Sequence, residues 1–212
     1  MSLYSWLLFD LDETLYAAGS GLWEEISIRI HSYMLEKVKI APTDIDRLRE
    51  AYLDSYGTTL AGLMAHHTID PHEYLAYVHD VPLENYVHTD PELQAMLSAL
   101  PHNKAILTNA SEQHAQRVLS CLGVARFFPL VIGVETLAFV NKPHPDAYRT
   151  ALDLLGNPDP EECMLIDDRI ANLEGAAVLG MGTILIGKHA SETWITAAIP
   201  RVHDLQMVLS PG

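Results

Sequence analysis

The stretch Leu7-Leu8-Phe9-Asp10-Leu11-Asp12-Glu13-Thr14-Leu15, residues 7–15, decides the fold, because in it an apolar run ends in two acidic residues. Residues 7–9 are typical of a short strand that is buried on both faces. Asp10 and Asp12 have one residue between them, so their side chains point the same way wherever the backbone stays extended. Carboxylates this close repel each other unless they share a proton or a cation. The stretch alone leaves two interpretations open: a metal-assisted site, or a strand that ends in a solvated acidic loop.

The composition is that of an ordinary globular protein, with 49% hydrophobic and 19% charged residues among 212. The formal net charge is −15, and so negative a chain would be repelled by a nucleic-acid backbone or an anionic membrane surface. We therefore expect neither a nucleic-acid polymer nor a membrane as partner. An anionic substrate would have to meet local positive charge or a cation.

Cysteine usage and hydropathy indicate a cytoplasmic protein. Cys121 and Cys163 each lie in an apolar segment, so two free thiols are expected rather than a bridge. The first apolar run is short and is broken by Asp10, which does not fit a secretory signal. The chain also has no run of the roughly 18 apolar residues that a membrane span needs.

Residues 17–89 are expected to form an all-helical unit. Small residues at 17–21 suggest a hinge, and the apolar spacing that follows predicts helices over residues 22–38, 44–57, 58–66 and 71–78. Ser20 and Thr43 are candidate N-caps for the first two helices, and Asp70 precedes a proline at the start of the fourth. No strand pattern interrupts this block, so it is inserted between the first strand and the rest of a sheet.

From Asp90 onward, helices and strands alternate. Helices are predicted over residues 91–100, 111–123, 145–155 and 170–179, and strands over residues 104–108, 130–134, 163–166 and 183–186. Such alternation implies right-handed crossovers and a parallel sheet covered on both faces. The sequence thus predicts an α/β fold with a Rossmann-like parallel sheet, built from residues 1–16 and 90–212, and a helical domain over residues 17–89. The state of residues 195–209 is left open.

Polar residues stand at the carboxyl ends of four of these strands. They are Asp10 with Asp12, Thr108 with Asn109, Lys142 in the loop after residues 130–134, and Asp167 with Asp168. Carboxyl ends of parallel strands meet at one edge of the sheet, where such folds bind ligands. This set suits phosphoryl transfer: one carboxylate attacks phosphorus, a second protonates the leaving oxygen, and Mg²⁺ between the acids offsets their repulsion. Lys142 and Thr108 would neutralise the remaining phosphate oxygens.

Four segments resemble, in order, the motifs of the haloacid dehalogenase-like hydrolase superfamily: Asp10-Leu11-Asp12-Glu13-Thr14, Leu107-Thr108-Asn109-Ala110, Lys142-Pro143 and Ile166-Asp167-Asp168. The helical insertion resembles the cap domain of that superfamily's first subclass. The resemblance implies that Asp10 is the nucleophile that forms an aspartyl-phosphate and that Asp12 is the general acid and base.

The same resemblance implies the ligand contacts. Thr108, Asn109 and Lys142 would bind phosphate, and Lys142 counts among the catalytic residues. Mg²⁺ would be held by Asp10, the backbone carbonyl of Asp12 and the pair Asp167 and Asp168. Either member of that pair remains possible as the direct ligand, with Asp168 favoured.

Weaker signals are similar to the pyrimidine 5′-nucleotidase branch: Leu15-Tyr16, Gly21-Leu22-Trp23, Tyr56-Gly57-Thr58-Thr59-Leu60 and His114-Ala115. Two positions depart from that pattern, because Ala61 stands where an arginine is expected and Arg169 where a serine is usual. The resemblance implies a magnesium-dependent phosphatase of the EC 3.1.3 class that acts on nucleoside monophosphates. Phosphoglycolate or a sugar phosphate is the alternative substrate. A phospho-accepting module and a non-catalytic binding protein rank lower.

The histidines and aromatic residues of the insertion have simpler interpretations. The spacing of His66, His67, His72 and His79 is not that of a two-histidine metal helix, so a solvated surface is expected for them. His144 is expected on the surface at a helix start. Trp23 and Tyr56 are expected in the core of the insertion, with contact to a base as the alternative.

Overall fold

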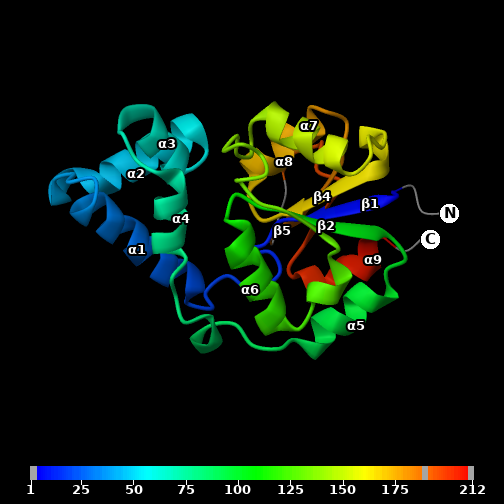
Figure 1. Cartoon of the computed structure of the whole chain (residues 1–212). Coiled ribbons are helices and arrows are strands. Elements are labelled where there is room, and N and C mark those ends of the chain that lie inside the picture. The colour runs from blue at the N-terminus through cyan, green and yellow to red at the C-terminus, as the bar shows by residue number, and fades with distance from the viewer. Residues whose placement is uncertain (1–3, 188–190, 210–212) are drawn as a thin grey trace.

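A computed structural model describes residues 4–187 and 191–209 of the chain (Figure 1). Residues 1–3, 188–190 and 210–212, which belong to the predicted α/β part, lie outside the described residues.

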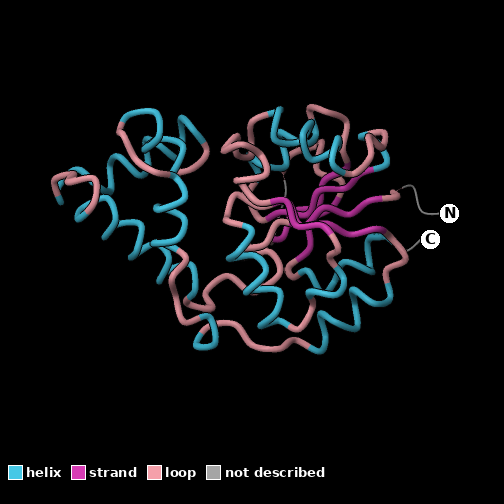
Figure 2. The backbone as a smooth tube through the Cα atoms, in the orientation of Figure 1, coloured by secondary structure: helices cyan, strands magenta, loops and turns pink. Residues whose placement is uncertain are grey.

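Within the described residues, a single parallel sheet forms the centre of the α/β part (Figure 2). Its strands are β1 (Trp6–Phe9), β2 (Asn103–Leu107), β3 (Leu130–Ile132), β4 (Cys163–Asp167), β5 (Gly182–Ile186) and β6 (Ala197–Ile199). Their order is β3-β2-β1-β4-β5-β6. The strand that contains the opening apolar run, β1, therefore lies between β2 and β4, with Leu8 opposite Ala105 on one side and Leu165 on the other.

Helices cover both faces of this sheet because its buried side chains alternate between two cores. Leu7 and Phe9 belong to one core and Leu8 to the other. The first core is covered by α5 (Pro91–Ala99), α6 (Glu112–Leu122) and α9 (Leu205–Leu209), and the second by α7 (Pro145–Leu154) and α8 (Ile170–Ala177) (Figure 1). Single turns of 3₁₀ helix lie at η1 (Leu83–Asn85), η2 (Ala125–Phe127), η3 (Pro160–Glu162) and η4 (Val202–Asp204). The predicted α/β fold class is confirmed.

Four of the five α-helices between β1 and β2 pack together beside the sheet (Figure 1). They are α1 (Leu22–Glu36), α2 (Pro42–Tyr56), α3 (Thr59–His66) and α4 (Pro71–Val78), and we call residues 22–78 the helical insert. Tyr33 of α1 meets Tyr74 of α4 edge to face, with ring centroids 5.0 Å apart. In α3, Gly62 lies so close to α2 that an added Cβ would be 2.1 Å from the Tyr52 ring.

Several helix starts follow the capping rules, whereas α1, α2 and α8 begin without a side-chain cap. Side chains of Thr58, Asp70, Asp90 and Ser111 each accept a backbone N–H in the first turn of the helix that follows. The prediction that Ser20 is the N-cap of α1 is wrong by one residue, because Gly21 takes that position, although Oγ of Ser20 accepts the N–H of Leu22 at 3.3 Å. The prediction that Thr43 caps α2 is wrong, because α2 begins one residue earlier at Pro42, with Ala41 as N-cap. Proline suits this position because the first helical N–H has no intrahelical partner to lose.

Residues 195–209, which the sequence left open, contain β6, η4 and α9. Strand β6 pairs in parallel with β5 at the edge of the sheet. At the opposite edge β3 ends at Ile132, earlier than predicted, and the N–H of Val134 instead donates to the carbonyl of Ala110 at 3.1 Å.

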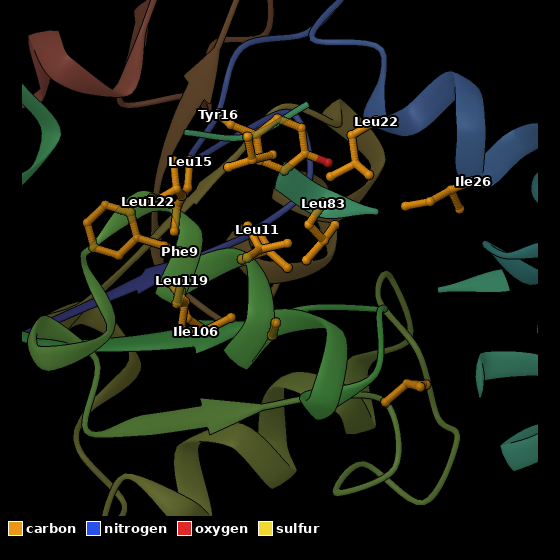
Figure 3. Packing of buried hydrophobic residues seen from close by; sticks show 14 of the residues in the cluster. Phe9, Leu11, Leu15, Tyr16, Leu22, Ile26, Leu83, Ile106, Leu119 and Leu122 are labelled. Carbon is orange, nitrogen blue, oxygen red and sulfur yellow. The ribbon is translucent and has the colours of Figure 1, made fainter. Parts of the chain in front are cut away.

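Apolar packing fixes the loop after β1. Leu11, Leu15 and Tyr16 pack in one cluster with Leu119 and Leu122 of α6 (Figure 3). Burial of each leucine contributes about 1.5–3 kcal/mol. The acidic residues at the end of β1 therefore sit on a rigidly packed segment. Of the helices within residues 4–187 and 191–209, none has the length and apolar character to cross a membrane.

Candidate active site

Lys142 lies at the centre of the polar cluster at the carboxyl ends of the strands. Its side chain is 0% exposed, and its Nζ donates to Oδ1 of Asp10 at 2.8 Å and to Oδ2 of Asp167 at 2.6 Å. Burial opposes the charge of the ammonium group, but the two carboxylates outweigh it and raise the pKa of Lys142 above its ordinary value. A buried lysine paired in this way is a fixed positive charge.

Three carboxylates converge beside this lysine. Asp10, Asp167 and Asp168 each offer an oxygen, and these oxygens all lie within 4.8 Å of one another. Burial raises the pKa of Asp10 well above its usual range, and the two neighbouring carboxylates add to this effect while Lys142 opposes it. Repulsion of this kind is relieved by a cation, and a set of carboxylate oxygens is the donor set that Mg²⁺ prefers. The residues present thus fit magnesium.

The two acids at the end of β4 differ in their surroundings. Asp167 accepts hydrogen bonds from Lys142, from the N–H of Arg169 at 2.9 Å and from Nδ2 of Asn172 at 3.0 Å. Asp168 is less buried and lies 3.5 Å from Oγ1 of Thr14. Burial and the charge of Asp167 raise the pKa of Asp168 to about 6. Asp168 is the more open of the two toward a cation.

Asn109 joins the second motif to the loop that carries Lys142. Its Oδ1 accepts the N–H of Lys142 at 2.8 Å, and its Nδ2 donates to the Lys142 carbonyl at 3.0 Å. Thr108 is 1% exposed, and its hydroxyl oxygen accepts the N–H of Ala110 at 3.0 Å. The side chain of Asn109 is therefore engaged with the protein. The groups that could donate to a phosphate are then the backbone N–H of Asn109 and the hydroxyl of Thr108.

Asp12 is bound by two residues whose roles the sequence did not reveal. Its Oδ1 lies 2.8 Å from the hydroxyl of Tyr16 and 3.1 Å from Nε2 of His114. Burial opposes the charge of Asp12, but the His114 imidazole and the two hydrogen bonds outweigh it and lower the pKa of Asp12 below its ordinary value. Both residues appeared only within short stretches of family resemblance.

The prediction that His79 lies on a solvated surface is wrong. His79 is 8% exposed, its Nδ1 lies 3.1 Å from Oγ of Ser111, and its ring stacks on that of His114. Burial holds the pKa of His79 well below its usual range. For its partner His114, the sequence did contain a signal of burial. His114 lies four residues before Val118, so helical spacing places both on the buried face of α6.

The other histidines behave closer to expectation. His66 and His72 are exposed and His67 is half-buried, in contact with the hydroxyl of Tyr52 at 3.1 Å. His144 is exposed at the start of α7, where its Nδ1 accepts the N–H of Asp146 at 3.2 Å.

A cavity of about 680 Å³ lies between the helical insert and the strand ends. Asp10, Asp12, Thr108, Asn109 and Asp168 line it from the sheet side. Its opposite wall is mainly apolar, formed by Trp23, Ile26, Ile30, Leu53, Leu60, Tyr74, Leu75 and Val78. Arg49 and Arg169 also line it. The expectation that Trp23 and Tyr56 lie in the core of the insert is wrong, because both are exposed and Trp23 faces this cavity.

The turn between α2 and α3, which lines the cavity, contacts the α/β part. Nδ2 of Asn141 donates to the carbonyl of Tyr56 at 2.9 Å, and Nη1 of Arg169 donates to the carbonyl of Gly57 at 3.2 Å. Arg169, one of the two departures from the branch pattern, thus connects the acidic pair of β4 to the helical insert.

Comparisons with known proteins agree with this arrangement. Phosphate metabolism protein 8 of Saccharomyces cerevisiae is 27% identical over 192 residues, which are 84% of this chain and 60% of that protein. The phosphoglycolate phosphatase of Aquifex aeolicus is 29% identical over 119 residues, 53% of this chain and 55% of that protein. The chain thus spans less than two thirds of the length of these two relatives.

A solved structure shows the same fold. The HAD phosphatase from Thermococcus onnurineus superposes with a TM-score of 0.65 at 17% identity, covering 96% of this chain and 97% of that one. The model of one family, haloacid dehalogenase-like hydrolase, matches residues 4–180. That match covers most of the sequence, and the chain belongs to the haloacid dehalogenase-like hydrolases.

Proposed function

We propose that the protein is a magnesium-dependent phosphatase of small phosphate monoesters that works through an aspartyl-phosphate on Asp10. The observation that carries this proposal is the convergence of Asp10, Asp167 and Asp168 around the buried Lys142 at the floor of a cavity. Asp12 stands beside them and supplies a second carboxylate for proton transfer. The similarity to a phosphoglycolate phosphatase supports the same class of reaction.

The reaction follows from these positions. A carboxylate oxygen of Asp10 attacks phosphorus, the bond to the leaving oxygen breaks, and Asp12 gives its proton to that oxygen. Asp12 then takes a proton from water, the water oxygen attacks phosphorus, and phosphate leaves Asp10. A bound phosphate dianion raises the pKa of Asp12 by like-charge repulsion, so the substrate itself favours the protonated acid.

Lys142, Thr108 and the backbone N–H of Asn109 offset the charge on the phosphate oxygens that do not react. Asp10, Asp168 and the backbone carbonyl of Asp12 would hold Mg²⁺, with Asp167 behind them. When bound, the ion offsets the charge of nucleophile and phosphate and polarises the phosphoryl group. The helical insert would act as a mobile cap that keeps water away during attack.

We propose nucleoside monophosphates, pyrimidine ones first, as the substrates. The cavity of about 680 Å³ suits a ligand of this size. Its apolar wall includes the exposed Trp23, whose ring suits a planar base. Phosphoglycolate is the second candidate, because Arg49 and Arg169 offer positive charge for a second anionic group. Both cysteines are free, which fits the proposed cytoplasmic location.

The proposal is tested by phosphate release from p-nitrophenyl phosphate and from a panel of nucleoside monophosphates, sugar phosphates and phosphoglycolate, with Mg²⁺. Asp10→Asn and a chelator should each abolish turnover. The matched control is Asp153→Asn, which changes an exposed acid on α7 and should leave turnover intact. Turnover that survives in Asp10→Asn would contradict the mechanism. A stable aspartyl-phosphate after treatment with acetyl phosphate, without turnover, would instead support a phospho-accepting module.

A further inference from the structure

Two donors from different parts of the chain fix the carboxylate of Asp12. The Tyr16 hydroxyl and the His114 ring both contact Oδ1, at 2.8 and 3.1 Å. An ionised carboxylate only accepts hydrogen bonds, so Nε2 of His114 must carry the proton. Because both donors hold the same oxygen, the rotation of the carboxylate about its Cβ–Cγ bond is restricted.

His114 is itself held from two sides. Its side chain is 0% exposed, and its ring stacks on that of His79 with centroids 4.2 Å apart and planes 18° apart. Ser111 joins the two residues, because its Oγ accepts the N–H of His114 at 3.1 Å and lies 3.1 Å from Nδ1 of His79. The stack with His79 thereby restrains the plane of the His114 ring, while the hydrogen bond from its backbone N–H to Ser111 restrains the first turn of α6.

Packing alone does not explain why a histidine occupies position 114. Nδ1 of His114 is buried and has no hydrogen-bond partner among the described residues. An unpaired buried polar atom is destabilising, and an apolar side chain on this face of α6 would avoid it. The imidazole is better explained by what its other nitrogen contacts, the Asp12 carboxylate.

His79 links this group to the helical insert. It follows the last residue of α4, and its carbonyl accepts a hydrogen bond from Nη1 of Arg117 at 2.9 Å, while Nη2 donates to the carbonyl of Val81 at 2.7 Å. The end of α4 is therefore attached to α6, the helix that carries His114. Helix α6 thus contacts both Asp12, through His114, and the end of the insert, through Arg117.

We propose that His114 and Tyr16 are positioning residues that hold Oδ1 of Asp12, so that Oδ2 faces the leaving oxygen of the substrate, and that His79 keeps the His114 ring in place. This inference rests on the proposed role of Asp12 as proton donor. A positioning role has a specific consequence. Its loss slows the hydrolysis of esters whose leaving group needs a proton, and it changes little the hydrolysis of esters whose leaving group departs as a stable anion.

The test compares kcat/KM for uridine 5′-monophosphate, whose alkoxide leaving group needs a proton, with kcat/KM for p-nitrophenyl phosphate, whose phenolate does not. This constant covers the steps up to departure of the leaving group. We expect His114→Leu to lower it about 100-fold for the nucleotide and less than about 5-fold for the aryl ester. Tyr16→Phe should act in the same direction, and the double variant should lose less than the product of the two single losses.

Two further variants separate positioning from packing. His114→Gln keeps an amide N–H that can reach Asp12 and should recover most of the nucleotide activity. His88→Leu, which changes an exposed histidine, should leave both constants unchanged. If His114→Leu does not fold, as judged by thermal melting, the same comparison of kcat/KM for the two esters is made with His114→Gln and Tyr16→Phe.

Equal losses on both esters, or no recovery with glutamine, would overturn the inference while leaving the phosphatase proposal in place. A wild-type chain that hydrolyses neither ester would overturn both, because Asp12 would then donate no proton.

Discussion

Gly57 lies in the turn between α2 and α3 and packs against the loop that carries Lys142. Its φ is +81°, and an added Cβ would lie 2.7 Å from Nδ2 of Asn141, 2.8 Å from Cδ of Pro143 and 2.9 Å from the carbonyl of Lys142. Only glycine satisfies both the left-handed backbone and this close approach.

We therefore expect Gly57→Ala to cost about 1–2 kcal/mol in backbone strain and to displace the turn from the Lys142 loop. kcat/KM should fall by about tenfold, since small displacements in a catalytic site reduce rate strongly. Gly156→Ala is the matched control, because Gly156 has φ +88° and nothing lies within 4 Å of an added Cβ. The control should lower the melting temperature with little change in turnover. Equal losses of turnover in the two variants would contradict the contact described.

His79 makes the stability of the fold depend on pH. Burial lowers its pKa well below the ordinary value of 6.5, so below pH 6.5 the unfolded chain binds a proton that the folded chain does not. The free energy of unfolding therefore falls as the pH drops below this value, by up to about 1.4 kcal/mol per pH unit from this residue. Urea denaturation at pH 7.5, 6.5 and 5.5 should give a shallower decline for His79→Leu than for wild type. Identical declines would show that His79 is not buried as a neutral ring.

At the scale of elements, α1 and α4 supply most of the apolar wall of the cavity. Trp23 and Ile26 from α1 and Tyr74 and Leu75 from α4 all line this wall. Trp23 is 42% exposed although its large apolar ring is unfavourable in water, which suits a surface that a substrate covers.

We expect Trp23→Ala to raise KM for pyrimidine nucleoside monophosphates by about tenfold, the equivalent of losing about 1–1.5 kcal/mol of aromatic contact. KM for phosphoglycolate, which has no ring, should change little. Ile28→Ala on the same helix is the control, because Ile28 is 60% exposed and does not line the cavity. An equal rise in KM for both substrates would argue against a base-binding wall.

The elements that position the motifs were predictable because the signals are local. Buried strands read as apolar runs, and the polar residues directly after them, such as Asp10, Thr108 and Asp167, must lie at one edge of a parallel sheet. The same geometry predicts that Lys142 lies near Asp10 and Asp167, although it does not predict the distances between their charged atoms.

The features that the sequence did not predict depend mainly on contacts between elements that are distant in sequence. The burial of His79 arises from its stack on His114 in α6, and no pattern within α4 encodes that partner. Strand β6 is too short to show an alternating pattern. Helix α2 begins at Pro42, so Thr43 lies inside the helix and cannot be its N-cap. Trp23 lies on the apolar side of α1, and only the assembled cavity shows that this side faces open space.

At the scale of the whole molecule, metal binding should stabilise the fold. A ligand that binds only the folded state adds about 2.7 kcal/mol at a concentration 100 times its Kd, which for a chain of this size corresponds to about 5–10 °C in melting temperature. Thermal melting with and without saturating MgCl₂ should show such a shift in wild type and a much smaller one in Asp168→Asn. Asp153→Asn should keep the full shift. A full shift in Asp168→Asn would mean that magnesium binds elsewhere.

The central place of β1 also has a consequence for synthesis of the chain. Strand β1 emerges from the ribosome before both of its neighbours, which are far along the sequence, β2 at Asn103–Leu107 and β4 at Cys163–Asp167. The helices of residues 22–78 rely on short-range contacts and can assemble first. Until β2 and β4 have been translated, Leu7, Leu8 and Phe9 have no sheet to join. The nascent chain therefore carries an unpaired apolar strand while about 150 residues are added between β1 and β4, which makes this segment a natural contact for a chaperone.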